Sequence, residues 1–379
     1  MTEVAEHPET PVALEESPVA VAGDGNASDA FLANLSRKEI PSLNGLRGIA
    51  AIAVLCIHVL AGRRWGAWFP GDQAVVLFFE LSGLLITWLL LAEKSQTGTI
   101  DLKKFYGRRA MRLLPAFYTI WLLVLFVRDV PDRWASFFYV KDVKDIYYGV
   151  YHLWPAGPQL LGMSWSLGVE EKFYLIWPRL LQKFASRKVP FLLCLAAVTD
   201  QIYHLIIYKM GFPLWAGYGF ETRLDGVLLG SAVAVAAKNG WKPPRWALHP
   251  ASLAASVAAV MAIGHLQYPA NVGWGVLAGA YPLLLILIYL VARPPKILNN
   301  PVATFFGKIS YSLYLCHLFV IFLLDSMHFA SARWEVAAKF SLSIAAATAI
   351  YFLIERPFLR WKDRLHAAKQ GARGLNPAS

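Results

Sequence analysis

The sequence predicts an all-α polytopic membrane protein with about ten transmembrane helices and both termini in the cytoplasm. Of its 379 residues, 57% are apolar and only 16% are charged, whereas soluble domains carry about 25% charged residues. Apolar runs recur along almost the whole chain, and Lys and Arg gather in alternate connections between them. We therefore expect one membrane domain and not two or three soluble domains.

Both ends of the chain differ from this domain. Residues 1–36 are acidic, contain no Lys or Arg and show weak apolar periodicity, so they predict a disordered tail. No cleavable signal peptide is expected, because the start is polar. The membrane domain is predicted at 37–365 and a short polar tail at 366–379. The three cysteines lie in apolar stretches and predict no disulfide framework.

Ten segments have the apolarity and the length, about 20 residues, that are typical of membrane helices. They lie at 46–62, 74–92, 112–129, 164–183, 189–208, 221–238, 248–267, 272–292, 306–325 and 336–354. Basic residues cluster in the connections 93–112, 179–188, 238–245 and 293–308 and after residue 356. These connections are therefore predicted to be cytoplasmic. The net charge of +11 then reflects topology and anionic lipid, and no nucleic-acid partner is expected.

The longest outward connection, near 130–163, is rich in aromatic residues: Trp134, Tyr139, Tyr147, Tyr148, Tyr151 and Trp154. An aromatic belt at the membrane interface is the favoured interpretation. A platform on which sugar rings stack is the alternative. The two have the same composition, so both stay open.

Ionisable residues within the predicted spans mark a site or a pathway. His58 lies 11 residues after Arg47, which places it about 16 Å deeper on the same helical face. Counting helical rise from the other spans puts Glu80, Glu170 and His317 at a similar depth, with Arg223 closer to the outer mouth. Ser166 and Glu170 are four residues apart and share a face. Such a polar layer suits an enzyme or a transporter.

Basic residues precede the third predicted span, in the run from Lys103 to Pro115. Positive-inside bias explains part of this cluster. Arg109 and Arg112, however, are three residues apart on one helical face, and paired guanidinium groups suit phosphate. The sequence therefore predicts a phosphate-rich ligand that enters from the cytosol.

These segments match a known pattern. They are residues 43–51 running on to His58, then 78–86, 108–115, 165–174, 309–317 and 355–357. In this order and at this spacing, the chain resembles the acyltransferase 3 family of bacterial membrane O-acyltransferases. The resemblance implies a multi-pass protein of the bacterial inner membrane. It also implies an acyl-CoA donor, usually acetyl-CoA, and a hydroxyl acceptor on a saccharide, a lipid-linked or exported glycan, or a macrolide-like product. No metal is expected.

The resemblance also assigns candidate residues. The Arg–His pair of the family falls on Arg47 and His58, its RxxR motif on Arg109 and Arg112, and its Ser–Glu motif on Ser166 and Glu170. Two positions depart from the family pattern, because residue 44 is Asn where Asp is more usual and residue 80 is Glu where an apolar residue is common. No appended hydrolase-like domain follows the last predicted span, so a second transfer step in this chain is not expected.

The resulting hypothesis is direct transfer. Arg109 and Arg112, helped by Arg108 and Lys104, would hold the CoA phosphates. His58 would act as general base on the acceptor hydroxyl, oriented by Glu170, with Arg47 and Ser166 completing the centre. A covalent acyl-histidine stays an open variant. On the acceptor side we expect Glu80, Arg223, His317 and Trp165.

The main alternative is a transporter or flippase for an envelope glycan or a lipid-linked sugar. A carrier of this kind usually has an internal repeat, and residues 43–200 and 201–357 show no convincing correspondence. A structural scaffold would leave the charged residues at mid-depth without a purpose.

Overall fold

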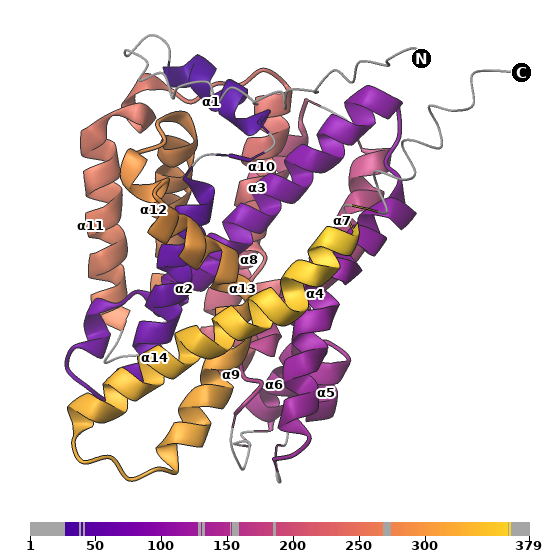
Figure 1. Cartoon of the computed structure of the whole chain (residues 1–379). Coiled ribbons are helices and arrows are strands. Elements are labelled where there is room, and N and C mark those ends of the chain that lie inside the picture. The colour runs from indigo at the N-terminus through magenta and orange to yellow at the C-terminus, as the bar shows by residue number, and fades with distance from the viewer. Residues whose placement is uncertain are drawn as a thin grey trace, which may run out of the picture.

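A computed structural model describes residues 27–37, 39–40, 42–127, 130, 133–151, 153, 159–184, 187–267, 274–362 and 364 of the chain. Within these residues the chain forms helices and turns, without a strand (Figure 1). This confirms the all-α prediction.

Each of the ten predicted segments coincides with a helix. These are α2 (Leu43–Val59), α3 (Gly71–Thr97), α4 (Leu102–Val124), α7 (Ser164–Lys183), α8 (Val189–Lys209), α10 (Asp225–Lys238), α11 (Pro250–Gln267), α12 (Trp274–Ala292), α13 (Pro301–Asp325) and α14 (Ala332–Ile350). Four are long and apolar enough to cross a bilayer: Gly71–Thr97, Val189–Lys209, Pro301–Asp325 and Ala332–Lys362. They indicate a membrane protein, whereas the full set of ten spans and its orientation stay predictions.

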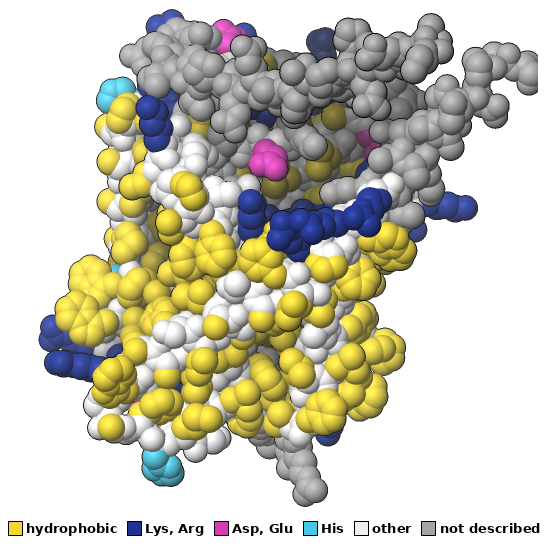
Figure 2. Space-filling view, viewed as in Figure 1, with side chains coloured by type: hydrophobic (Ala, Val, Ile, Leu, Met, Phe, Trp, Pro, Cys, Tyr) yellow, Lys and Arg dark blue, Asp and Glu magenta, His cyan; other side chains and the backbone are white. Residues whose placement is uncertain are grey.

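Hydrophobic side chains cover much of the face on which α14 crosses the other helices, and Lys and Arg form a band above them (Figure 2). Such a boundary is typical of a membrane surface. Helix α1 lies at the upper end of the molecule in Figure 1, and the yellow helix that contains α14 rises diagonally from the lower left. The short helices α5 (Arg133–Phe137), α6 (Lys141–Val150) and α9 (Pro213–Tyr218) lie at the lower end.

Helix α1 (Ala27–Leu35) corrects the prediction of a disordered tail up to residue 36, which is wrong for residues 27–35. Phe31 is fully buried and meets the ring of Trp241 edge-on at 6.2 Å. The Asn34 amide donates a 2.8 Å hydrogen bond to the carbonyl of Val291 in α12. Burial of this apolar face stabilises a helix too short to be stable alone. The other residues of both predicted tails lie outside the described part of the chain.

Two pairs of helices approach closely because glycine leaves room for the neighbouring backbone. A Cβ atom on Gly307 of α13 would lie 2.0 Å from the carbonyl oxygen of Asn44 in α2. A Cβ atom on Gly230 of α10 would lie 2.1 Å from the carbonyl oxygen of Glu80 in α3. Small residues commonly permit such contacts between membrane helices. The contact at Gly307 keeps the start of α2, with Arg47, beside α13.

The aromatic connection exposes Trp134, Tyr147 and Tyr151. An interfacial belt and a sugar platform would both expose them, so the two interpretations stay open. Trp154 lies outside the described residues.

Candidate functional site

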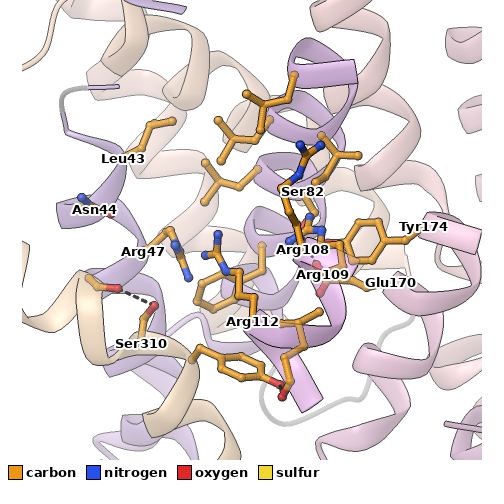
Figure 3. A pocket seen from close by; sticks show the side chains of 18 of the residues that line it. Leu43, Asn44, Arg47, Ser82, Arg108, Arg109, Arg112, Glu170, Tyr174 and Ser310 are labelled. Atoms are coloured by element: carbon orange, nitrogen blue, oxygen red, sulfur yellow. Dashed lines mark hydrogen bonds between the residues drawn. The ribbon is translucent and has the colours of Figure 1, made fainter. Parts of the chain in front are cut away.

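A cavity of about 620 Å³ opens among α2, α3, α4, α7, α13 and the helical segment 351–362 that follows α14. Its wall includes Arg47, Arg108, Arg109 and Arg112, together with Ser166 and Glu170. We call this space the arginine cavity. Figure 3 shows these arginines directed toward a common space, with Arg47 and Arg112 facing each other. The structure thus brings six of the predicted site residues together.

Helix α4 presents its arginines in successive positions along the wall. The helix begins after Asp101, whose side chain accepts a 2.9 Å hydrogen bond from the backbone N–H of Lys104. Arg108 forms an ion pair with Glu93 at 3.4 Å, and the Arg109 guanidinium lies 4.2 Å from the centroid of the Tyr174 ring. Arg112 follows about one turn deeper. Lys104 is exposed and does not belong to the cavity wall that the structure describes.

Two carboxylates face the arginines, and a serine from another helix holds each of them. The Ser82 hydroxyl donates a 2.5 Å hydrogen bond to Glu170. The Ser312 hydroxyl donates one of 2.9 Å to Glu355, which also lines the cavity. Charge-assisted hydrogen bonds of this kind fix carboxylates firmly.

Ser166 and Tyr314 form a polar contact in the cavity wall. Their hydroxyl oxygens lie 2.6 Å apart, and the Ser166 hydroxyl is also 3.0 Å from the carbonyl oxygen of Met163. The Tyr314 ring lies 5.9 Å from the ring of His317. Tyr314 therefore connects the cavity with a second group of residues.

This second group is the histidine pair, His58 and His317, whose ring centroids are 4.9 Å apart. Nδ1 of His58 lies 2.8 Å from the carbonyl oxygen of Val54, and Nδ1 of His317 lies 2.8 Å from that of Tyr314. Because a carbonyl oxygen only accepts, each Nδ1 carries the proton and each Nε2 of a neutral ring offers a lone pair. His58 is exposed, whereas His317 is buried.

The structure does not join His58 to Glu170 as the sequence suggested. Among the described residues, the hydrogen bond of Glu170 goes to Ser82, and the cations that act on it are Arg109, Arg47 and Arg112. The carboxylate whose charge acts on His58 is that of Asp72, at the start of α3. The equal depth of His58 and Glu170 placed them in one layer, but it did not specify the direction in which each side chain points.

All four residues expected on the acceptor side, Glu80, Arg223, His317 and Trp165, lie outside the described wall of the arginine cavity. Glu80 is 0% exposed at the contact of α3 with α10, and neither of its carboxylate oxygens has a hydrogen-bond partner among the described residues. Its predicted contact with a substrate does not fit this burial. The Arg223 guanidinium lies 5.3 Å from the Trp165 ring centroid, and Trp165 also packs against Tyr218 at 5.2 Å.

Sequence reasoning missed Tyr314, Glu355 and Asp72 as candidate site residues. Tyr314 lies three residues before His317, and Glu355 opens the segment Glu-Arg-Pro. Both residues therefore lie within the segments, 309–317 and 355–357, that resemble the family. Spacing alone did not show that their side chains face the cavity. In the part of the chain that the structure describes, no group of three His, Cys, Asp or Glu side chains could hold a metal ion.

A membrane helical bundle with a cationic cavity beside paired histidines defines a broad class of membrane transferases and carriers. Within that class the chain belongs to the acyltransferase 3 family, because the family's acyltransferase domain model matches residues 40–356. Resemblance at six motifs is thus confirmed over almost the whole membrane domain.

Relatives in three bacteria agree with this membership. A protein of Staphylococcus aureus (strain COL), provisionally named an O-acetyltransferase, is 30% identical over 392 residues, which cover 93% of this chain and 61% of the relative. The peptidoglycan O-acetyltransferase OatA of Listeria monocytogenes is 36% identical over 217 residues, or 52% of this chain and 34% of that protein. A Bacillus subtilis (strain 168) protein, provisionally named a peptidoglycan O-acetyltransferase, is 28% identical over 84% of this chain and 55% of its own length.

The chain thus spans about three fifths of the length of the Staphylococcus aureus relative. No solved structure matches the chain significantly.

Proposed function

We propose that the chain is a multi-pass O-acyltransferase of the bacterial cytoplasmic membrane. It transfers an acyl group, acetyl in the simplest case, from cytosolic acyl-CoA to a hydroxyl of a saccharide or of a lipid-linked or exported glycan. The observation that carries this proposal is the arginine cavity together with its neighbour, the histidine pair. Tyr314 lines the cavity, and its ring centroid lies 5.9 Å from that of His317.

The cavity suits the donor in size and in charge. Its volume of about 620 Å³ falls among ligand sites, which commonly enclose about 300–1,000 Å³. Guanidinium groups bind phosphate bidentately, and Arg108 and Arg109 lie on the first turns of α4, toward the predicted cytoplasmic side. The pantetheine arm is long and flexible, so the thioester reaches toward Tyr314 while the phosphates stay at these arginines.

The chemistry follows from the free Nε2 of His58. This nitrogen takes the proton of the acceptor hydroxyl as the hydroxyl oxygen attacks the thioester carbonyl carbon. The C–S bond then breaks, and the CoA thiolate takes the proton from the imidazolium. Asp72, whose charge acts on His58, stabilises the imidazolium electrostatically, while the carbonyl of Val54 orients the ring in place of Glu170. In the acyl-histidine variant, Nε2 itself attacks the thioester and the hydroxyl then attacks the acyl-imidazole.

The acceptor reaches His58 from the side opposite to the arginines, where the histidine is exposed. Arg223 and His317 are buried, so they support this side from within: Arg223 packs against Trp165 and His317 packs against His58. The relatives whose names mention peptidoglycan support a glycan hydroxyl as the acceptor.

The test is acyl transfer by the purified full chain in vesicles, with labelled acetyl-CoA and a soluble peptidoglycan fragment. We expect transfer by the wild type and a loss of about 10²- to 10⁴-fold in His58→Ala. His328→Ala removes an exposed histidine outside both groups and should retain full transfer. Near-normal transfer by His58→Ala would remove the base assignment. Failure of the wild type to bind acetyl-CoA would favour the transporter or flippase.

A further inference from the structure

Glu355 is a buried carboxylate that the proposed chemistry does not use. It is 5% exposed, accepts a 2.9 Å hydrogen bond from Ser312 of α13 and lines the arginine cavity. An ionised side chain in such a position is costly unless charged or hydrogen-bonding groups compensate it.

A π-helical turn in the backbone directs the side chain of Glu355 inward. After α14 the chain forms one π-helical turn, Tyr351–Glu355, and then continues as an α-helix that contains Pro357. Proline lacks an N–H, and its ring clashes with the carbonyl group four residues earlier in a regular α-helix. Single π-turns of this kind frequently occur at functional sites. Leu353, two residues before Glu355, is 72% exposed, so the turn separates an inward carboxylate from outward apolar side chains.

The charges that act on Glu355 are those of Arg112 and Arg47. These two arginines also act on each other, and Figure 3 shows them face to face. Two guanidinium groups held in this way repel each other unless anions lie nearby. Glu355, held by Ser312, acts on both arginines, and Glu170, held by Ser82, acts on Arg47. Glu355 therefore offsets positive charge on both Arg47 and Arg112.

Arg108 and Arg109 have different surroundings. Arg108 lies on the first turns of α4 with Glu93 as its partner, and Arg109 lies against the face of Tyr174 and shares Glu170 as a neighbouring charge. The remaining cations of the cavity wall are Arg37, Lys308 and Lys362, of which Arg37 follows α1 and Lys308 lies in α13. The described cavity wall thus carries seven cations against three carboxylates, Glu39, Glu170 and Glu355, so net positive charge remains beyond Arg47 and Arg112.

We propose that Glu355 is a positioning residue: it neutralises Arg47 and Arg112 and fixes them as hydrogen-bond donors for an uncharged group. That group is the thioester carbonyl of the donor or an amide carbonyl of its pantetheine arm. The phosphates bind at Arg108 and Arg109. The inference rests on the proposed acyl-CoA donor. It assigns Arg112 to an uncharged carbonyl group of the donor, whereas Arg109 binds the phosphates. Donors fixed toward the thioester oxygen stabilise the negative charge that develops there during attack.

The test compares kcat and KM of the full chain in vesicles for acetyl-CoA and for acetyl-pantetheine, which has no phosphate. Glu355→Gln keeps the size of the side chain and removes its charge. We expect kcat to fall by about tenfold or more with both donors. The KM for acetyl-CoA should stay within about twofold, because the phosphates bind elsewhere. Glu355→Asp should restore part of kcat.

Ser312→Ala keeps the charge and removes only its anchor, so a smaller loss in kcat, of about three- to fivefold, is expected. This variant also keeps the test informative if Glu355→Gln fails to fold. Glu335→Gln is the matched control, because Glu335 pairs with Arg63 and Lys339, and all three residues lie outside the described cavity wall. It should leave both constants unchanged.

A lower KM for acetyl-CoA with unchanged kcat in Glu355→Gln would overturn the inference, because Glu355 would then compete with the phosphates. Unchanged kcat per folded molecule, with a lower melting temperature, would also overturn it and leave only a packing role. In both cases an active wild type keeps the proposed function intact. A wild type that transfers nothing from either donor would instead overturn the proposed function and this inference with it.

Discussion

The arginine cavity and the histidine pair differ in how their polar groups are held. In the cavity, carboxylates from α7 and from the segment 351–362 are anchored by serines of other helices and face arginines. In the histidine pair, each Nδ1 is bound to a carbonyl of its own helix, and no carboxylate forms a described hydrogen bond with either ring. The comparison indicates that donor binding and proton transfer are carried by two neighbouring groups. Ser166 and Tyr314 connect them.

The largest effect on donor binding should come from Arg109. We expect Arg109→Ala to weaken CoA binding by about 10- to 100-fold, because a charge-assisted contact to phosphate is lost. Equilibrium binding of labelled CoA to the detergent-solubilised protein measures this. Arg245→Ala removes an exposed arginine outside the cavity wall and controls for net charge. Unchanged CoA affinity in Arg109→Ala would show that the phosphates bind elsewhere.

His317 should affect transfer without affecting CoA binding. We expect His317→Gln to lower kcat by about tenfold, because the ring that packs beside His58 is lost while His58 keeps its own backbone hydrogen bond. The same vesicle assay gives kcat, and CoA binding serves as the internal control. A change in CoA affinity with unchanged kcat would place His317 in the donor site and remove the distinction between the two groups.

Tyr314 tests the connection between the two groups. Tyr314→Phe keeps the ring beside His317 and removes the hydroxyl that meets Ser166. We expect kcat to fall by about three- to tenfold, since one hydrogen bond in the cavity wall is lost. Ser166→Ala removes the other partner and should give a loss of similar size. Losses that add in the double variant would indicate that the two hydroxyls act independently.

The smallest effect is expected at Glu80. A buried carboxylate without a hydrogen-bond donor is costly when ionised, so Glu80→Gln should keep transfer within about twofold and leave the melting temperature equal or higher. Transfer and thermal unfolding of the purified variant measure both quantities. A large loss of transfer without loss of folded protein would return Glu80 to the acceptor site.

Much of the site was predictable because its residues stand in motifs with fixed helical spacing. Arg109 and Arg112 are three residues apart and do line one cavity, as do Arg47, Ser166 and Glu170. Counting residues along a helix gives depth, however, and does not give the direction of a side chain about the helix axis. For this reason the predicted pairing of Glu170 with His58 is not the one that the structure shows, and Glu80 lies buried instead of facing a substrate.

Other features depended on contacts between distant segments. Helix α1 forms because Phe31 and Asn34 find partners at Trp241 and Val291, which no local pattern in an acidic tail indicates. Glu355 faces the cavity because of a π-turn, and regular helical periodicity cannot predict such a turn.

The separation of donor binding from proton transfer is tested most directly by the dissociation constant for CoA of purified His58→Ala, measured beside Arg109→Ala. We predict that His58→Ala binds CoA within about twofold of the wild type, because its ring lies outside the described wall of the arginine cavity. Arg109→Ala should bind CoA far more weakly. If His58→Ala weakens CoA binding as much as Arg109→Ala does, the two groups form a single site and the account is wrong.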